Sequence, residues 1–181
     1  MKRWFALSAI GRDRPGIVAD LAELVYDCDC NLEDSSMTVL GSEFAVLLLL
    51  TGEAVDVEQR LSTASKRLEW EKRLTVFIRP LESEPIPYSV GKEAAPYELQ
   101  ATGVDKAGLV ARVARCLAGH GASITQMFTQ SRPEPGTGTP IYTMAIRLDL
   151  PKDVAEAGLR AELDKVAAEL NIDVALQAKQ A

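Results

Sequence analysis

The fold of this chain is decided by the stretch Gly11-Arg12-Asp13-Arg14-Pro15-Gly16-Ile17-Val18-Ala19, which carries an apolar strand into a tight turn and then opens a helix. The same pattern returns 92 residues later as Gly103-Val104-Asp105-Lys106-Ala107-Gly108-Leu109-Val110-Ala111. An alignment of the chain on itself at this offset needs no gap up to Thr38 and Gln130. Self-similarity at one fixed offset indicates a duplicated unit, so we expect two copies of one small domain.

Apolar periodicity predicts the element order βαββαβ in each copy. The first copy has strand patterns over residues 4–10, 31–40, 44–50 and 73–79, with helical patterns from Ile17 and from Asp56. The second copy has strand patterns over residues 97–104, 122–132, 142–150 and 172–177, with helical patterns after Gly108 and after Asp153. The predicted fold class is therefore α+β: two ferredoxin-like domains, each an antiparallel sheet with both helices on one face.

The predicted domains cover residues 1–81 and 96–181. Residues 82–95 between them contain prolines and charges without periodicity, which is typical of an extended linker. Polar residues before three helices predict side-chain caps. Asp13 is predicted to accept a hydrogen bond from the amide of Gly16 at the start of the first helix. Asp56 with Gln59, and Asp153 with Glu156, are predicted to form capping boxes at the starts of two further helices.

The strand over residues 44–50 makes a prediction about assembly. Its alternation directs Phe44, Val46, Leu48 and Leu50 toward the helices and leaves Leu47 and Leu49 on the open face of the sheet. Soluble proteins usually cover such apolar patches. We therefore expect both leucines to be buried against the other copy or a second chain, and a homodimer is one of the two outcomes.

Composition excludes several classes of function. The 20 Lys and Arg residues against 26 Asp and Glu give a net charge of −6, so the protein as a whole repels a phosphate backbone. We expect no direct binding to nucleic acid, and no retention of double-stranded DNA at physiological salt. The longest apolar run, residues 44–50, is too short to cross a membrane. Three cysteines and the lack of a signal peptide favour the cytoplasm.

No catalytic or metal-binding set emerges from the sequence. Cys28-Asp29-Cys30 has the wrong spacing for a zinc knuckle, and His120 is the only histidine in the chain. Nucleophile-elbow, phosphate-loop and zinc-protease motifs are also missing. We therefore expect structural thiols, no bound metal, no cofactor and no enzyme activity.

The turn before each first helix is suited to hold a small carboxylate. Backbone amides at Gly16, Ile17 and Val18 would point outward at the positive end of a helix dipole. Glycine turns at helix starts are also common in proteins that bind nothing. Arg14 and Lys106 either serve a ligand or are solvated, because a cation in a first helical turn is electrostatically unfavourable.

The repeated pattern strand, Gly-x-Asp-[Arg/Lys]-x-Gly-[Ile/Leu]-Val, helix resembles the ACT domain, a small-molecule-sensing module of amino-acid metabolism. The chain also resembles the glycine cleavage system transcriptional repressor family in three features. These are two such domains with nothing else, the motif at residues 13–19, and the loop Pro135-Gly136-Thr137-Gly138-Thr139-Pro140. The resemblance implies a regulatory protein that does not touch DNA. It implies binding to a DNA-binding activator of the glycine cleavage genes when glycine is available.

The resemblance also implies where an amino-acid effector binds: at the first strand–helix turn and at the start of the second strand, often across a domain interface. The implied residues are Asp13, Arg14, Gly16, Ile17, Asn31 and Leu32 in the first copy and Asp105, Lys106, Gly108, Leu109, Ser123 and Ile124 in the second. The second copy departs from the first because Ala107 replaces Pro15 and Ser123 replaces Asn31.

Other interpretations stay open. The run Asp13-Arg14-Pro15-Gly16-Ile17-Val18 also resembles the regulatory head of formyltetrahydrofolate deformylase, although this chain has no residues for the catalytic domain of that enzyme. An amino-acid-binding regulatory subunit of a metabolic enzyme and a structural interaction module without ligand are two further alternatives.

Overall fold

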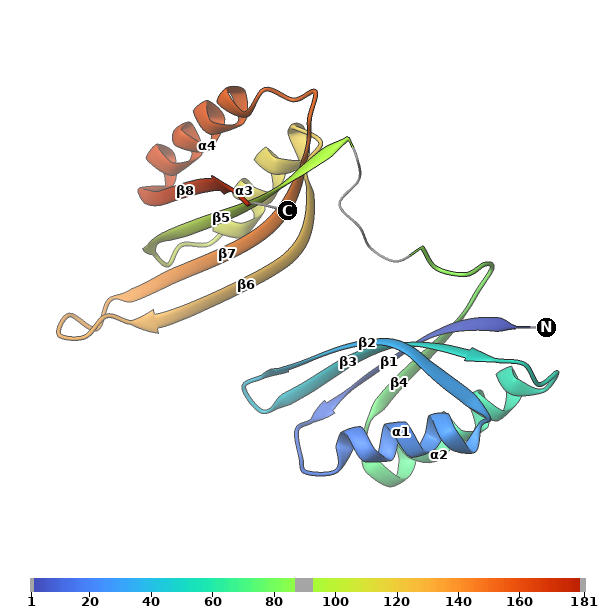
Figure 1. Ribbon diagram of the computed structural model, residues 1–181. Helices are drawn as coiled ribbons and strands as arrows, with labels where there is room; N and C mark the ends of the chain where they lie inside the picture. The colour runs from blue at the N-terminus through green and yellow to red at the C-terminus, as the bar shows by residue number, and fades with distance from the viewer. Residues whose placement is uncertain (1, 87–92, 180–181) are drawn as a thin grey trace. The chain divides into compact units, whose positions relative to one another are not determined.

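The computed structural model describes residues 2–86 and 93–179, and part of the predicted linker lies outside them. The chain divides into two compact units, Met1–Pro87 and Tyr88–Ala181 (Figure 1). Both units have the predicted element order βαββαβ. The first consists of β1 (Arg3–Arg12), α1 (Ile17–Asp27), β2 (Cys30–Leu40), β3 (Glu43–Gly52), α2 (Val57–Lys72) and β4 (Thr75–Leu81). The second consists of β5 (Ala94–Val104), α3 (Leu109–Gly119), β6 (Ser123–Pro133), β7 (Pro140–Pro151), α4 (Glu156–Leu170) and β8 (Ile172–Ala178).

Each unit is one four-stranded sheet with its two helices packed on one face (Figure 1). The strand orders are β2-β3-β1-β4 and β6-β7-β5-β8, and all neighbouring strands are antiparallel. The predicted fold class, two ferredoxin-like α+β units, is confirmed. No helix of the described chain has the length and apolar character that a membrane span needs.

The strand registers repeat between the units. Leu7 in β1 lies opposite Leu48 in β3, and Leu99 in β5 lies opposite Ile146 in β7. The offset is 92 residues for the first strands and 98 for their partners, so the β6–β7 hairpin is six residues longer than the β2–β3 hairpin. The additional residues include the Pro- and Gly-rich stretch of residues 135–140. A register shift also recurs in both edge strands, at Leu32/Asp34 and at Ile124/Gln126.

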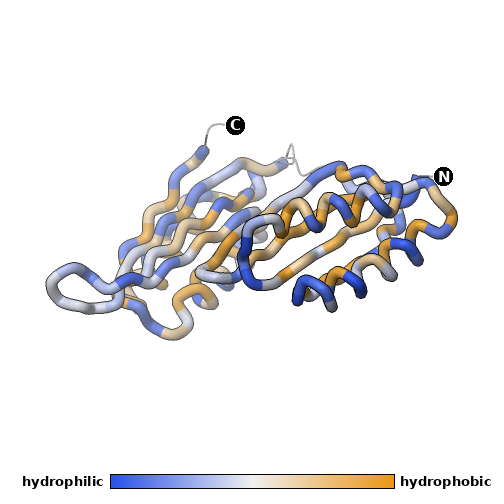
Figure 2. Tube along the Cα trace, turned by 90° about the horizontal axis from the view of Figure 1, so that it is seen from below, coloured by the Kyte–Doolittle hydropathy of each residue, from blue (hydrophilic) through white to orange (hydrophobic). Residues whose placement is uncertain are grey.

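The hydrophobic cores lie between the helices and the sheets, as the periodicity predicts. Figure 2 shows hydrophobic and hydrophilic residues alternating along the helices and strands. Phe44, Val46, Leu48 and Leu50 are buried on the helix side of β3, which confirms their predicted orientation. Val18 in the first turn of α1 is 52% exposed and does not belong to the buried stripe of that helix.

The predicted side-chain caps are wrong. Gly16 is the N-cap of α1 in a left-handed conformation with φ 88°, and no side chain caps the helix. Asp13 is instead held at the hairpin, where its amide donates to the carbonyl of Ser42 at 2.8 Å. Asp56 is the N-cap of α2, but its carboxylate pairs with Arg60 at 3.2 Å instead of capping the helix.

The fourth helix also starts differently from the prediction. Ala155, not Asp153, is its N-cap, and Glu156 accepts a hydrogen bond from the hydroxyl of Tyr97 at 2.7 Å. The same carboxylate pairs with Arg160 one turn later. Tyr97 on β5 and Arg160 on the next turn of α4 therefore bind the carboxylate of Glu156 that the predicted capping box would have used.

The first strand of the second unit begins earlier than periodicity indicates. Ala94 and Ala95 pair with Pro151 and Leu150 of β7, so β5 takes up the end of the predicted linker. The amide of Lys152 also donates to the carbonyl of Glu93 at 2.8 Å. Backbone hydrogen bonds to the long strand β7 extend β5 toward the linker. The periodicity of side chains in the sequence does not predict such backbone pairing.

Gly11 and Gly103 are required by packing inside each unit. A Cβ atom on Gly11 would lie 2.5 Å from Cδ2 of Leu74 and 3.3 Å from the carbonyl oxygen of Arg73. A Cβ atom on Gly103 would lie 2.5 Å from Cγ2 and 3.0 Å from Cα of Ile172. The repeated glycine therefore lets the first strand approach the segment that enters the last strand.

We predict that Gly103→Ala lowers the free energy of unfolding of the second unit by about 1–3 kcal/mol, the usual cost of overpacking. Gly11→Ala should cost less, because Cδ2 of Leu74 is the mobile end of a side chain whereas Cα of Ile172 is backbone. Urea unfolding measures both. The control is Gly158→Ala in α4, where a Cβ atom meets nothing within 4 Å and should be neutral or stabilising. Equal stability of the Gly103 and Gly158 variants would contradict this assignment.

Leu47 and Leu49 point away from the helices, as expected from the alternation of β3. Leu47 is 56% exposed and Leu49 is partly exposed within the chain. We predict that Leu47→Ser combined with Leu49→Ser loosens association with the other unit or a second chain before either core unfolds. Each leucine contributes about 1.5–3 kcal/mol if fully buried. Analytical ultracentrifugation and thermal melting measure the two effects, and Ala145→Ser, at the equivalent position of β7, is the control. Association unchanged by the double substitution would argue against an interface on this face.

Candidate functional site

The two strand–helix turns have the same backbone geometry. Gly16 and Gly108 adopt φ angles of 88° and 92°, which L-residues with side chains rarely accept. Each turn is also tied to the hairpin of its own unit. The amide of Asp13 donates to Ser42, and the amide of Asp105 donates to the carbonyl of Pro140 at 2.9 Å. The turns are therefore fixed parts of the fold.

Arg14 has a partner within its unit. Its guanidinium forms an ion pair with Asp20 on α1, and Lys72 at the end of α2 lies 3.4 Å from the same carboxylate. Arg14, and then Lys72, hold the pKa of Asp20 below its ordinary value. Arg14 thus joins the turn to α1, and Asp20 in turn joins α1 to α2, which the sequence did not predict.

Lys106 has a different partner in the second unit. Its Nζ donates to the carbonyl of Leu170 at 3.2 Å, at the C-terminal end of α4 where unpaired carbonyls attract cations. Asn171 follows in the left-handed conformation that ends the helix. Arg14 therefore ties its turn to α1 and Lys106 ties its turn to α4, so neither cation is simply solvated.

Ile17 and Leu109 contribute their side chains to the fold. Both are 3% exposed, so only their backbone faces the turn. The amide of Ile17, predicted to be free, donates to the carbonyl of Arg14 at 3.4 Å. A carboxylate at this turn would have to replace that long hydrogen bond.

The remaining predicted residues lie at the other end of each sheet. Asn31 is opposite Thr51, which is opposite Trp4 near the start of β1, whereas Gly11 near the end of β1 is opposite Phe44. A strand rises about 3.3 Å per residue, so the two ends are more than ~20 Å apart. Ser123 and Ile124 occupy the equivalent end of β6, far from Gly108. Within one unit the two parts of the predicted site do not meet.

Each sheet has an apolar edge, because β2 and β6 are edge strands in the described chain. Their exposed apolar side chains are Leu32, Met37, Val39 and Leu40 on β2 and Ile124, Met127 and Phe128 on β6. Long apolar edges of this kind favour association with another sheet.

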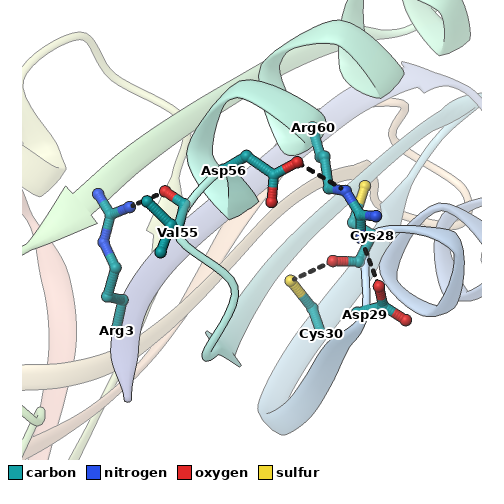
Figure 3. Close-up of polar contacts among 7 residues, drawn as sticks. All are labelled: Arg3, Cys28, Asp29, Cys30, Val55, Asp56 and Arg60. Atoms are coloured by element: carbon teal, nitrogen blue, oxygen red, sulfur yellow. Dashed lines mark hydrogen bonds and ion pairs between the residues drawn. The ribbon is translucent and has the colours of Figure 1, made fainter. Parts of the chain in front are cut away.

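Grooves are present between the helices of each unit, away from the predicted residues. The first unit has a groove of ≈ 480 Å³ between the end of α1 and the start of α2. Figure 3 shows Arg60 of this groove between Asp56 and Asp29, beside Cys28. Both carboxylates engage the guanidinium, so it is not a free anion-binding group.

The cysteines of the first unit are inert structural thiols. Cys28 and Cys30 are buried and free, and Sγ of Cys30 lies 3.6 Å from the carbonyl of Cys28 (Figure 3). Burial raises the pKa of Cys30 to about 11. A thiol that stays protonated at neutral pH is a poor nucleophile.

Comparison with known proteins agrees with this geometry. A family model described as the ACT domain matches residues 4–78, and the second unit repeats the same topology and turn. The chain is therefore similar to the ACT domain in its first unit and repeats the topology of that unit in its second. It resembles the glycine cleavage system transcriptional repressor of Escherichia coli K12, to which it is 27% identical over 94% of this chain and 87% of that protein.

Two solved structures share the fold over the whole chain. A protein of unknown function from Galdieria sulphuraria is 26% identical, with a TM-score of 0.77, and the match covers 99% of this chain and 100% of that one. A structure provisionally named as a glycine cleavage system transcriptional repressor is 21% identical, with a TM-score of 0.73 and coverage of 100% and 99%. At that identity the second structure supports the fold alone.

The ion pair at the first turn leads to a pH prediction. The pKa of Asp20 is lower in the folded state, so its stabilising effect is present above its ordinary pKa of 3.8 and is lost as pH falls below it. Asp20→Asn should cost about 1 kcal/mol at pH 7, the order of a partly exposed ion pair. Urea unfolding between pH 7 and pH 2.5 should show the difference from wild type disappearing in acid.

Asp27→Asn is the matched control, because Asp27 is an exposed carboxylate at the other end of the same helix. Its effect should be small at every pH. A difference between wild type and Asp20→Asn that stays constant down to pH 2.5 would contradict the ionised pair.

Proposed function

We propose that this chain is a non-catalytic regulatory protein that senses a small amino acid, glycine or a similar one, and controls a transcriptional activator by protein–protein contact. The observation that carries the proposal is the similarity to a glycine cleavage system transcriptional repressor across both units. A match confined to one ACT domain would fit many enzymes. A match over 94% of this chain includes the tandem arrangement itself.

The chemistry of an amino-acid ligand fits the two parts of the predicted site. An amino acid carries a carboxylate, which suits the N-terminal end of α1, and an ammonium group, which suits the amide oxygen of Asn31. We infer that Asp13, Arg14, Gly16 and Ile17 of one chain act together with Asn31 and Leu32 of a second copy of the chain. Asp105, Lys106, Gly108, Leu109, Ser123 and Ile124 would form the second site in the same way.

We infer that the chain controls transcription through contact with a protein and not through contact with DNA. The net charge of −6 opposes binding to a phosphate backbone, so a DNA-binding partner has to supply the contact with the gene. A role of this kind belongs in the cytoplasm. Catalysis is not part of the proposal, since the thiols of the described residues are buried and the pKa of each is raised.

The experiment is isothermal titration calorimetry of the full chain with a panel of amino acids that includes glycine. We predict that one small amino acid binds and that Asn31→Ala weakens this binding about tenfold or more, because a hydrogen bond to a charged group contributes about 1.5–3 kcal/mol. Ser123→Ala is the matched variant in the second unit. It should have a smaller effect, since a shorter side chain occupies that position.

Asn31 is a better test position than Gly16. A side chain on Gly16 would strain a backbone with φ 88°, so loss of binding in Gly16→Val would not separate the site from the fold. Binding that Asn31→Ala leaves unchanged would exclude the start of β2 from the site. No binding by any amino acid would favour a structural interaction module, and binding without any effect on an activator would favour a regulatory subunit of an enzyme.

A further inference from the structure

Three side chains with metal-binding donor atoms converge between the helices of the second unit. Cys116 and His120 are four residues apart on one side of α3 and its C-cap, and Glu162 faces them from α4. The thiol sulfur, an imidazole nitrogen and a carboxylate oxygen all lie within 4.8 Å of one another. Within residues 2–86 and 93–179, this is the one such group of three.

The imidazole is already oriented as a metal ligand requires. Nδ1 of His120 lies 3.0 Å from the carbonyl of Cys116, a contact in which Nδ1–H donates. Its other nitrogen, Nε2, then carries the free lone pair and lies 3.5 Å from the carboxylate of Glu162. Ligands of a tetrahedral zinc ion are about 3.3–3.6 Å apart, from metal–ligand distances of about 2.0–2.3 Å. A backbone carbonyl that fixes the tautomer is the usual support of a metal-binding histidine.

The donors are placed at the boundary between core and solvent. Cys116 is 4% exposed, whereas the side chain of Glu162 is 54% exposed at a groove of ≈ 420 Å³ between the helices. An ion can therefore enter from the groove and reach the buried sulfur. The C-terminal end of α3 lies at the site, and the dipole of a helix favours a cation there.

The charges of the site balance a divalent ion. A thiolate and a carboxylate supply two negative charges, and the neutral imidazole adds none. Arg115 and Lys165 also line the groove, so a cation without the thiolate would meet a positive surface. Arg112 contributes less to the positive charge of the groove, because Glu169 forms an ion pair with it.

We propose that Cys116, His120 and Glu162 bind a zinc-like transition-metal ion that joins α3 to α4 and keeps a fourth position open to the groove. Thiolate with imidazole selects ions such as Zn²⁺ and Co²⁺ over Mg²⁺ or Ca²⁺. The site belongs to the second unit alone, since Leu24 and Cys28 occupy the positions equivalent to Cys116 and His120 in the first. It is independent of the proposed function.

Binding is coupled to a proton. A cysteine binds such an ion as the thiolate, so the sulfur gives up its proton on binding. The metal–sulfur bond forms as the sulfur–hydrogen bond breaks, and the proton leaves to solvent. Affinity therefore falls as pH falls, with one proton released for each ion bound.

The test uses the full chain, stripped of metal with a chelator and titrated with Co²⁺ under reducing conditions. We expect one Co²⁺ per chain, a thiolate-to-cobalt charge-transfer band and the visible bands of a tetrahedral ion. Zn²⁺ should displace the cobalt and abolish these bands. Cys116→Ser should remove the charge-transfer band, and His120→Gln and Glu162→Gln should each weaken binding about tenfold or more.

The matched controls are Cys28→Ser and Cys30→Ser in the first unit, where the thiols have no histidine beside them. Both should keep the cobalt spectrum. A spectrum that survives Cys116→Ser, or one that disappears with Cys28→Ser, would overturn the assignment. The absence of any charge-transfer band in the folded wild-type chain would also overturn it and leave His120 and Glu162 as a side-chain contact only. Circular dichroism of each variant separates loss of the site from loss of the fold.

Discussion

The left-handed glycine at the start of α1 and α3 is the constraint on which the rest of each unit depends. With φ 88° at Gly16 and 92° at Gly108, the chain turns back after the central strand and sends the helix antiparallel to it across the sheet. The apolar stripe of the helix then meets the helix-facing side of the sheet, including Leu7 and Leu48. A residue with a Cβ atom at either position would meet backbone strain before any contact is made.

The surroundings of the turn show that the same feature also organises the polar contacts. Asp13 and Asp105 bind the hairpins through their amides, while Arg14 pairs with Asp20 on α1 and Lys106 binds the C-terminal end of α4. These partners differ between the copies although the backbone is the same. Duplication has therefore kept the turn and changed the side chains around it, which is consistent with units that bind differently.

The two units also differ between their helices. The first has an arginine held by two carboxylates beside a buried thiol, and the second has a thiol, an imidazole and a carboxylate. Both arrangements lie in the groove between the helices and away from the strand–helix turn. An effector at the turn and an ion between the helices would thus occupy separate surfaces of the second unit.

Sequence by itself determined the duplication, the element order, the α+β class and the buried side of β3. These depend on local periodicity, and the buried positions of β3 from Phe44 to Leu50 follow it without exception. Tertiary structure decided which side chains meet. Asp13 could not be recognised as a poor cap because the conformation of Gly16 displaces it, and Asn31 was separated from the turn by the length of β1. The sequence did not indicate that Glu162 lies beside Cys116 and His120. Only the packing of α4 on α3 brings this carboxylate, some forty residues away in the chain, close to the thiol sulfur and the imidazole nitrogen.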